Sequence, residues 1–461
     1  MRVIITVSLS LALTFFTVSL ASKKKQGDRR FNDLHYSKAI LFYLKAIEKG
    51  DSTVAKNLAE SCLHINQPNN AAKWYEVVID QGEYTDRDIL NYIQAVKGTG
   101  DYSKYEELTA RYSTMPASDG LKEILVKNDQ FDIVKTNINT IYSDCSPTFL
   151  GDSSLVFMSD RKIDGIKWKK HPWSGEHFYN LLVANITDSL SKLEGVRSLS
   201  EQINTKYEEG PATFSSDGQL MIYSGTARRK LDSASNYLRD KEVANMELYL
   251  ASYDQEEQEW NTPEKFPIAD SIYEMEHPYL SPDGNTLYFS SDHPYPGHQG
   301  KHDLYKVVKK GESWSDPINL GKGINTEKNE GFPFIQPKTN ELYFSSDGHK
   351  GLGKLDVFVS AKKGDVYTKA INLGTPVNSY SDDFGVTFNK SMTIGYFSSN
   401  RPGGEGLDDI YGIIVNKSSL LLAGVVRDEL NTPIDSAIVR LFDKEGNILD
   451  SVFTDSLGKY D

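Results

Sequence analysis

Five copies of one short, β-rich segment are the feature that most constrains how this 461-residue chain can fold. Each copy places an aromatic residue among apolar and small residues and ends in a polar turn, a pattern typical of a buried strand. The central aromatic residues are Phe157, Tyr223, Phe289, Phe344 and Phe397, which lie 66, 66, 55 and 53 residues apart. Repeats of this length indicate an architecture built from several copies of one small unit.

Other strand-like segments recur in phase with these copies. A hairpin with Asp-Gly at its turn precedes the aromatic segment, as at Leu280–Asn285, and a strand that begins with an acid follows it, as at Asp303–Lys309. A single four-stranded sheet cannot cover both of its own faces, whereas several sheets arranged radially cover one another. The pattern therefore predicts an all-β propeller over residues 131–415, with five blades, or six if the long loops of the first two units contain a further blade.

The segment Phe131–Asn139 precedes the first full unit and has the pattern of one more strand. We expect it to complete the last blade and so to close the ring. The repeats resemble the TolB-type, WD-like propeller repeats, whose pattern runs S-P-D-G, then L-Y-F-S-S-D, then D-L-Y. Residues Ser281–Asp292 and Asp303–Tyr305 match this pattern closely.

The copy at Ser290–Tyr305 contains His293, His298 and His302, and this density raises the question of a metal site. Its two aspartates recur in the sibling copies, whereas its histidines do not. We therefore expect the aspartates to accept backbone N–H bonds and the histidines to lie in a solvated loop. No catalytic, cofactor-binding or metal-binding residue is predicted, and no binding residue is assigned. The recurring acids are Asp292, matched by Asp347 and Asn400; Asp303, matched by Asp356 and Asp409; and, directly before the repeats, Asp144, Glu209, Glu330 and Asp383.

Residues 28–115 show helical periodicity instead. Ala39, Ala71 and Tyr105 occupy corresponding places in three amphipathic stretches, 32 and 34 residues apart. This spacing resembles tetratricopeptide repeats, which implies an all-α stack of helix pairs that presents a groove. Trp74 and Tyr75 are expected to pack between the helices.

The first 21 residues form an apolar run after Arg2 that ends in small residues, which is typical of a cleaved signal peptide. An uncleaved anchor is the alternative, but the run is close to the shortest that can span a bilayer, and three lysines, Lys23–Lys25, follow it. We expect export, cleavage and no transmembrane span in the mature chain.

Within residues 420–461, the alternation of apolar and polar residues predicts short strands at Ala437–Leu441 and Ile448–Phe453. Three strands cannot close a sandwich, so an incomplete β-sandwich is expected. The segment resembles the carboxypeptidase regulatory-like domain. The residues that carry this resemblance are Gly424, Asp428, Pro433, Ala437, Val439, Leu441, Thr454, Asp455, Gly458 and Tyr460.

Composition and missing motifs exclude several function classes. A formal net charge of −13 disfavours nucleic-acid partners. The chain has no G-x-S-x-G, no phosphate-binding glycine loop and no H-E-x-x-H, so neither an enzyme nor a cofactor is predicted. Cys62 and Cys145 are expected to be two buried thiols, with a disulfide as the alternative in an oxidising compartment.

The order of the parts carries a further resemblance. Signal peptide, tetratricopeptide-like helices, TolB-like propeller and regulatory-like β domain resemble the multidomain OmpA-family proteins of Bacteroidota, especially the PorE type of the type IX secretion system. The resemblance implies a non-enzymatic scaffold in the periplasm, near the outer membrane or cell wall, that binds protein partners. Its link to peptidoglycan would need an OmpA-like domain that this chain lacks. Two alternatives stay open: the propeller-bearing portion of a secreted peptidase whose hydrolase domain is missing, and a TolB-like module that binds a peptide tail.

Overall fold

A computed structural model describes residues 23–460 apart from 33–34, 83, 112–127, 163–169, 171–174, 188–189, 228–244, 270–271, 417–423, 429 and 443–447. The predicted signal peptide, residues 1–21, lies outside the described residues. The chain forms two compact units, residues 1–415 and 416–461. Within the described parts of both units, no helix is long and apolar enough to cross a membrane.

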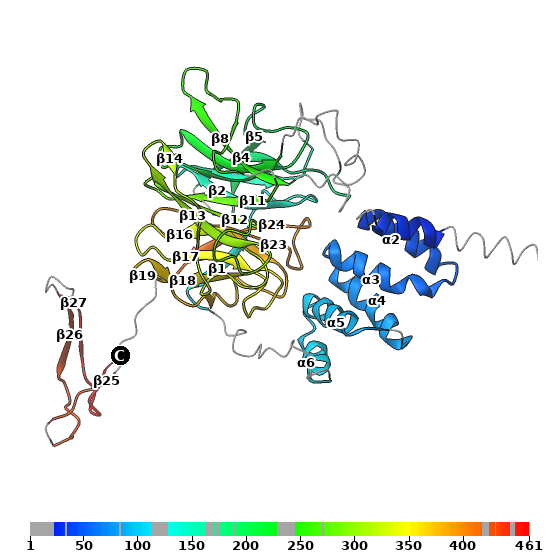
Figure 1. The fold of residues 1–461 in the computed structure, drawn as a ribbon. Helices are drawn as coiled ribbons and strands as arrows, with labels where there is room; N and C mark the ends of the chain where they lie inside the picture. Colours follow the sequence, from blue (N-terminus) through cyan, green and yellow to red (C-terminus); the bar gives the residue numbers. More distant parts are fainter. Residues whose placement is uncertain are drawn as a thin grey trace, which may run out of the picture. The chain divides into compact units, whose positions relative to one another are not determined.

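The first part of the larger unit is helical, as predicted (Figure 1). Residues 23–32 are helical, and a 3-10 turn, η1 (Ser52–Val54), connects α2 to α3. The α-helices that follow residue 35 are α2 (Tyr36–Ile47), α3 (Ala55–His64), α4 (Pro68–Asp80), α5 (Asp86–Gly98) and α6 (Tyr102–Arg111).

Consecutive helices pack through the apolar faces that the periodicity indicates. Ala39 and Tyr43 of α2 and Ala71 and Tyr75 of α4 are fully buried in one core. Two of these tyrosines make the same contact one repeat apart. Asn57 Nδ2 donates to the Tyr43 hydroxyl at 3.2 Å, and Asn91 Nδ2 donates to the Tyr75 hydroxyl at 3.0 Å. The helix pairs therefore repeat in their internal polar contacts as well as in their apolar spacing.

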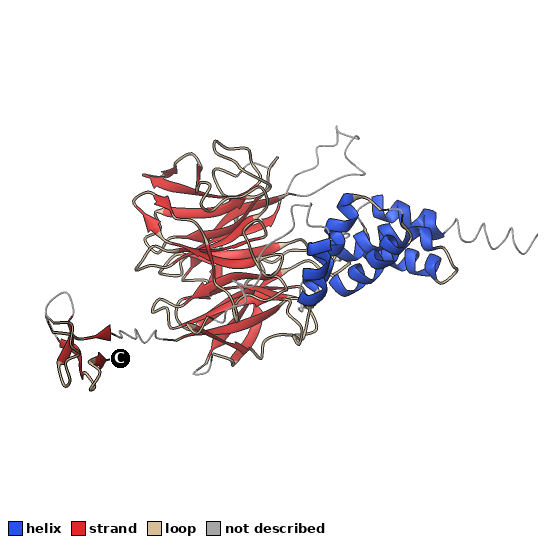
Figure 2. Cartoon of the chain, turned by 90° about the horizontal axis from the view of Figure 1, so that it is seen from below, coloured by secondary structure: helices blue, strands red, loops and turns tan. Residues whose placement is uncertain are grey.

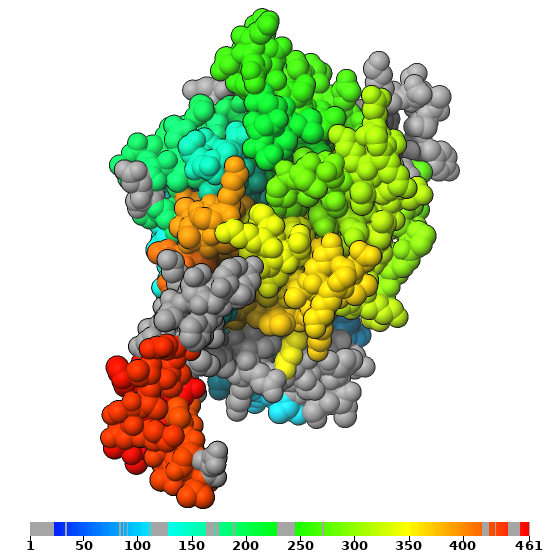
Figure 3. All heavy atoms as spheres, turned by 90° about the vertical axis from the view of Figure 1, so that its left-hand side faces the viewer, coloured from blue at the N-terminus to red at the C-terminus, as the bar shows by residue number. Residues whose placement is uncertain are grey.

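Residues 131–415 form five antiparallel sheets arranged as a ring, so the chain has five blades rather than six (Figures 1 and 2). The predicted fold class is confirmed. In the space-filling view the blades follow one another from cyan and green through yellow to orange (Figure 3). From the innermost strand outward, the sheets are β2 (Asp144–Leu150), β3 (Ser154–Ser159), β4 (Asn180–Ile186) and β5 (Leu193–Ser198); β6 (Glu209–Phe214), β7 (Leu220–Thr226), β8 (Met246–Asp254) and β10 (Glu264–Lys265); β11 (Met275–Leu280), β12 (Thr286–Ser291), β13 (Asp303–Lys310) and β15 (Ile318–Asn319); β16 (Glu330–Ile335), β17 (Leu342–Ser346), β18 (Asp356–Ser360) and β21 (Ile371–Asn372); and β22 (Asp383–Phe388), β23 (Ile394–Ser399), β24 (Asp409–Val415) and β1 (Phe131–Lys135).

The five recurring aromatic residues lie on the second strand of each blade, and all have a relative exposure of 0%. The recurring aromatic residues of the sequence repeat are thus core residues of the blades. Short additional ladders extend the outer parts of the blades. They are formed by β9 (Glu259–Trp260), β14 (Ser313–Trp314), β19 (Lys362–Lys363) and β20 (Val366–Tyr367).

The ring is closed by the segment that the sequence predicts for this role. Strand β1 pairs antiparallel with β24, from Phe131 opposite Val415 to Lys135 opposite Tyr411. The fifth blade therefore combines the first strand of the propeller with its last three. Closure of this kind holds the two ends of a propeller together.

Both cysteines are free thiols, so the disulfide alternative is not formed. Cys62 is buried among the helices and Cys145 between the first blades. Burial raises the pKa of the Cys62 thiol to about 12, which makes it unreactive in the folded chain.

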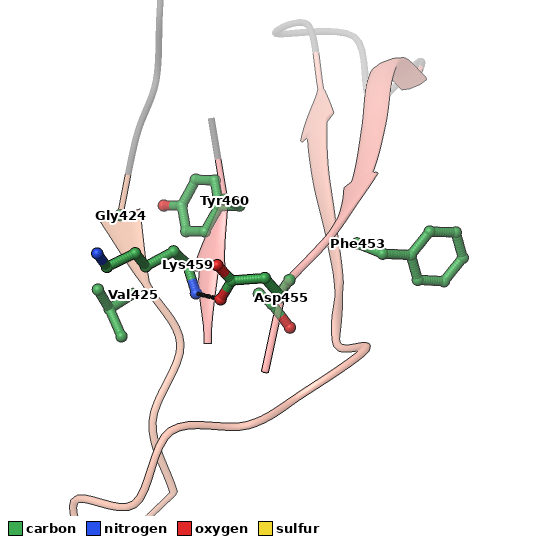
Figure 4. Close-up of a pocket in the computed structure, with 7 residues that line it drawn as sticks. Gly424, Val425, Phe453, Asp455, Lys459 and Tyr460 are labelled. Carbon is green, nitrogen blue, oxygen red and sulfur yellow. Dashed lines mark hydrogen bonds between the residues drawn. The ribbon is translucent and has the colours of Figure 1, made fainter. Parts of the chain in front are cut away.

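The smaller unit contains two short ladders, β25 (Gly424–Val425) with β28 (Lys459–Tyr460) and β26 (Ile438–Phe442) with β27 (Ile448–Phe453). The two predicted strands are confirmed. A hollow of about 600 Å³ lies between the ladders (Figure 4). Its one acid, Asp455, accepts hydrogen bonds from the backbone N–H groups of Leu457 at 2.8 Å and Lys459 at 2.9 Å. This carboxylate therefore holds the turn before β28.

Candidate functional site

The inner strands of the five blades surround a central cavity of about 50 Å³. A cavity of this size has room for a few water molecules. Each inner strand contributes three consecutive residues to the lining: Ser146–Thr148, Pro211–Thr213, His277–Tyr279, Phe332–Phe334 and Gly385–Thr387.

Every inner strand is interrupted at the same level of the ring. The register against the second strand shifts in all five blades, as expected for a β-bulge. Beside each shift lies a residue with positive φ, and three of the five carry a side chain there, which costs roughly 1–3 kcal/mol each. The five residues and their φ values are Ser146 (52°), Gly210 (108°), His277 (54°), Phe332 (53°) and Gly385 (64°).

One of these side chains, His277, packs against other aromatic rings of the cavity wall. It stacks on Phe332 with ring centroids 3.6 Å apart, and Phe332 in turn lies 5.0 Å from Phe384. Burial lowers the pKa of His277 to about 3, so the ring is neutral. Its Nδ1 lies 3.7 Å from Glu276 Oε1 and has no hydrogen-bond partner among the described residues.

At the end of the cavity where the inner strands begin, an acid connects neighbouring blades. In the fourth blade, Glu330 accepts hydrogen bonds from Thr326 N at 2.9 Å and Thr326 Oγ1 at 2.7 Å. Asn325, the residue before that threonine, exchanges two hydrogen bonds with the backbone of Leu304 in the third blade, at 2.8 and 3.0 Å. We call this Asn-Thr/Ser-x-x-x-acid arrangement the blade latch.

Blade latches occur at four of the five inner strands. The sequence contains both the Asn-Thr/Ser pair and the acid, but the hydrogen bond between the acid and the Thr or Ser four residues earlier was not predicted. The fixed spacing of four residues is the signal that could have revealed it. The other three latches are Asn139–Asp144, Asn204–Glu209 and Asn378–Asp383.

In the first and fifth blades an arginine completes the latch. Arg161 Nη2 lies 2.5 Å from Asp144 Oδ1, and Arg401 Nη2 lies 2.6 Å from Asp383 Oδ1. Both aspartate side chains have a relative exposure of 0%. Each arginine thus neutralises a carboxylate that is removed from water.

The third blade departs from this pattern. Met275, opposite Ser291, takes the place that Glu330 and Asp383 hold opposite Ser346 and Ser399. His293 takes the place of the arginine, two residues after that serine. The acids of this blade lie on either side of Met275 instead, at Glu274 and Glu276.

The recurring aspartates have the structural role that the sequence predicts. Asp303 accepts hydrogen bonds from the backbone N–H groups of Gln299 at 2.7 Å and Gly300 at 3.2 Å. Asp356 and Asp409 hold their own loops in the same way. Asp292 instead accepts a bond from Glu274 N, at 2.7 Å, and so fixes the start of the inner strand.

The three histidines lie in the loop between β12 and β13, as expected, but the expectation that their rings are solvated is wrong, because each ring is packed or hydrogen-bonded. His293 stacks on Tyr295 with centroids 3.7 Å apart. His298 Nδ1 lies 2.9 Å from the Tyr305 hydroxyl. His302 Nε2 lies 2.9 Å from Glu274 Oε2, and the His302 side chain is only 21% exposed. The repeat shows that the histidines are peculiar to one blade, but not where their rings point.

One group of residues could hold a metal ion. The ligand atoms of Glu274, Asp292 and His302 all lie within 4.8 Å of one another. Among the described residues, no other three His, Cys, Asp or Glu side chains come together in this way. It lies at the end of the cavity where the latches of the other blades are found.

Several carboxyl groups near this end of the ring have raised pKa values. Burial, assisted by the charges of Glu209 and Asp160, raises the pKa of Glu208 to about 8. Burial likewise raises the pKa of Asp160 and that of Asp408 to about 6. The end of the cavity thus changes charge within the range from pH 5 to 8.

We predict that Glu208→Gln flattens the pH dependence of stability. The folded pKa of Glu208 exceeds its unfolded value, so this group lowers the free energy of unfolding progressively from about pH 4.5 to about pH 8. The variant should unfold with wild-type stability at pH 5 and be more stable by ~2 kcal/mol at pH 9. Urea denaturation at both pH values measures this, with the exposed Glu201→Gln as control. A wild-type pH profile for the Glu208→Gln variant would contradict the prediction.

No protein-family model matches the sequence, and no curated protein matches it. Solved structures with a distant likeness include a mannose phosphorylase from Leishmania mexicana, at 10% identity and a TM-score of 0.37, covering 68% of this chain and 94% of that one. A sialidase from Trypanosoma rangeli matches at 9% identity and a TM-score of 0.34, covering 63% and 59%. TolB from Acinetobacter baumannii matches at 11% identity and a TM-score of 0.29, covering 62% and 66%. The likeness concerns the fold alone.

Proposed function

We propose that this chain is a non-enzymatic adaptor of the cell envelope that binds protein partners through its helical repeats and its propeller. The observation that supports the proposal most is that the buried acids of the ring take part in structural hydrogen bonds. The carboxylates of the blade latches are engaged in hydrogen bonds that hold neighbouring blades together. The cavity of about 50 Å³ offers little room for a substrate. Binding is therefore assigned to the outer surfaces.

The helical region offers an apolar surface for a partner. Leu41 and Leu44 lie three residues apart on α2 and so on one side of the helix, with exposures of 59% and 36%. Stacked helical repeats present wide surfaces to partners, and we assign these two leucines to such a surface. The propeller adds a rigid frame whose loops vary from blade to blade.

The location belongs to the same proposal. The apolar N-terminal run favours export to the periplasm. Attachment to the cell wall would depend on a further, OmpA-like domain, as the resemblance of the domain order implies. Two other functions remain candidates, a portion of a secreted peptidase and a module that binds a peptide tail. The small cavity disfavours the second of these, at least for a tail inside the ring.

The proposal is tested by crosslinking the full chain in intact cells and identifying its partners by mass spectrometry. Wild-type protein should crosslink reproducibly to a small set of envelope proteins. The double variant Leu41→Asp/Leu44→Asp should lose the crosslinks made by the helical region, whereas Lys45→Ala, an exposed change on the same helix, should keep them. Hydrolysis of a peptide library by the purified chain, or crosslinks no stronger than background, would contradict the adaptor function.

A further inference from the structure

The third blade lacks both parts of the charged latch found in the first and fifth blades. Met275, with an exposure of 1%, lies where the acid would be, and His293 lies where the arginine would be. The same end of this blade nevertheless brings acidic and imidazole groups together. Glu274 precedes β11, Asp292 follows β12 and His302 precedes β13, so the three strand ends meet at one place.

The geometry of these groups suits a metal ion. Two donor atoms bound to one ion at ~2.1 Å lie about 3.0–3.4 Å apart in tetrahedral or octahedral coordination. His302 Nε2 and Glu274 Oε2 lie 2.9 Å apart. The whole set spans no more than 4.8 Å, so small side-chain movements would bring three donors around one centre. Glu276 Oε1, 3.9 Å from His302 Nε2, is a fourth donor within reach.

The neighbouring groups hold these side chains in place. His302 Nδ1 lies 3.3 Å from Asn329 Oδ1, a contact that orients the ring and directs Nε2 toward the carboxylates. Asp292 accepts a hydrogen bond from Glu274 N with Oδ1, which fixes the Asp292 side chain. A ligand histidine whose second nitrogen is held by an oxygen acceptor is typical of protein metal sites.

No other blade has this set of residues. The places of Glu274, Asp292 and His302 are taken by Asn329, Asp347 and Leu355 in the fourth blade and by Asp382, Asn400 and Asp408 in the fifth. The hydrogen bond from the inner strand is kept there, as Asp347 Oδ1 accepts from Asn329 N at 2.8 Å. That bond is therefore part of the general repeat, whereas the histidine, and its combination with two carboxylates, belong to the third blade.

We propose that Glu274, Asp292 and His302, with Glu276 as a fourth ligand, bind a divalent transition-metal ion, Zn²⁺ in preference to Mn²⁺. One imidazole with two or three carboxylates suits these ions, and the Irving–Williams order places Zn²⁺ above Mn²⁺. Ca²⁺ and Mg²⁺, which favour sites made of oxygen alone, are disfavoured. The ion would connect the starts of β11 and β13 at the end of the third blade where the latch is missing. This inference goes beyond the adaptor function and does not depend on it.

The experiment uses the full chain, freed of any histidine tag and treated with EDTA. Titration calorimetry with ZnCl₂, MnCl₂ and CaCl₂ in separate runs should show one equivalent of Zn²⁺ bound, weaker Mn²⁺ binding and no Ca²⁺ binding. Zn²⁺ should also raise the midpoint of thermal unfolding. Asp292→Asn, which keeps an oxygen acceptor for Glu274 N, and Glu274→Gln should each weaken Zn²⁺ binding at least tenfold.

Two variants serve as controls. Asp347→Asn makes the same change at the corresponding place of the fourth blade, and His298→Ala removes a histidine of the same loop that lies outside the ligand set. Both should bind Zn²⁺ like the wild type. Folding of each variant is checked by circular dichroism, and the wild-type titration alone decides the matter if no variant folds. Absence of a one-equivalent Zn²⁺ or Mn²⁺ isotherm for the wild type, or unchanged binding by Asp292→Asn and Glu274→Gln, would overturn the proposal.

Discussion

Phe131→Ala is expected to lower the free energy of unfolding of the propeller by about 3–5 kcal/mol. Phe131 begins β1, is only 5% exposed and packs in one apolar cluster with Tyr411 and Ile413 of β24. The substitution removes a buried ring and leaves a cavity at the junction where the two ends of the propeller meet. Urea denaturation followed by tryptophan fluorescence measures the loss, since Trp260 and Trp314 both lie in the propeller.

Asp132→Ala is the matched control, because Asp132 lies on the same strand with its side chain exposed. It should change the free energy of unfolding by less than about 0.5 kcal/mol. Closure by β1 joins segments that are nearly the whole propeller apart in sequence, so weakening it should also increase cleavage by proteases in the fifth blade. Equal urea midpoints for Phe131→Ala and Asp132→Ala would show that β1 does not stabilise the ring.

The fold could be predicted because the repeat carries its signal in local patterns. Each recurring aromatic residue, such as Phe289, lies in a run of strand-forming residues, and the chain contains five copies of this run. The count of strands per unit then leaves few ways to cover the sheets. Closure by Phe131–Lys135 followed from the same count, since one strand was left over at the start and one was missing at the end.

The contacts at the end of the cavity could not be predicted in the same way. The blade latch joins residues of different blades, for example Asn325 and Leu304, and a local pattern does not show which blades are neighbours. The sibling copies correctly showed that Asp303 is structural. They gave no information on His302, which has no counterpart and whose ring meets Glu274, 28 residues earlier in the chain. Residues peculiar to one repeat are therefore the ones whose surroundings only the structure reveals.

Arg401→Ala is expected to lower the free energy of unfolding by about 3–5 kcal/mol, since it leaves a buried carboxylate without its partner. Arg401 donates to Asp383 Oδ1 at 2.6 Å and to the carbonyl oxygens of Pro376 at 2.9 Å and Val377 at 2.6 Å. Its guanidinium also lies 5.1 Å from the ring centroid of Phe397. Lys390→Ala is the control, because Lys390 lies in the turn before β23, the strand that Arg401 follows, and its side chain is 67% exposed.

The pH dependence of the loss separates charge from packing. Burial raises the pKa of Asp383, while Arg401 opposes this shift. Without the arginine the folded pKa of Asp383 rises further. The charge penalty of the variant is therefore full above that raised folded pKa, and it shrinks as the pH falls toward the folded pKa that Asp383 has with Arg401 in place. The double variant Arg401→Ala/Asp383→Asn should recover part of the stability at pH 7, because no charge is then left buried. A deficit of the single variant that is the same at pH 8 and pH 5, with no recovery in the double variant, would mean that Arg401 stabilises the fifth blade through its packing and its carbonyl contacts rather than by neutralising Asp383.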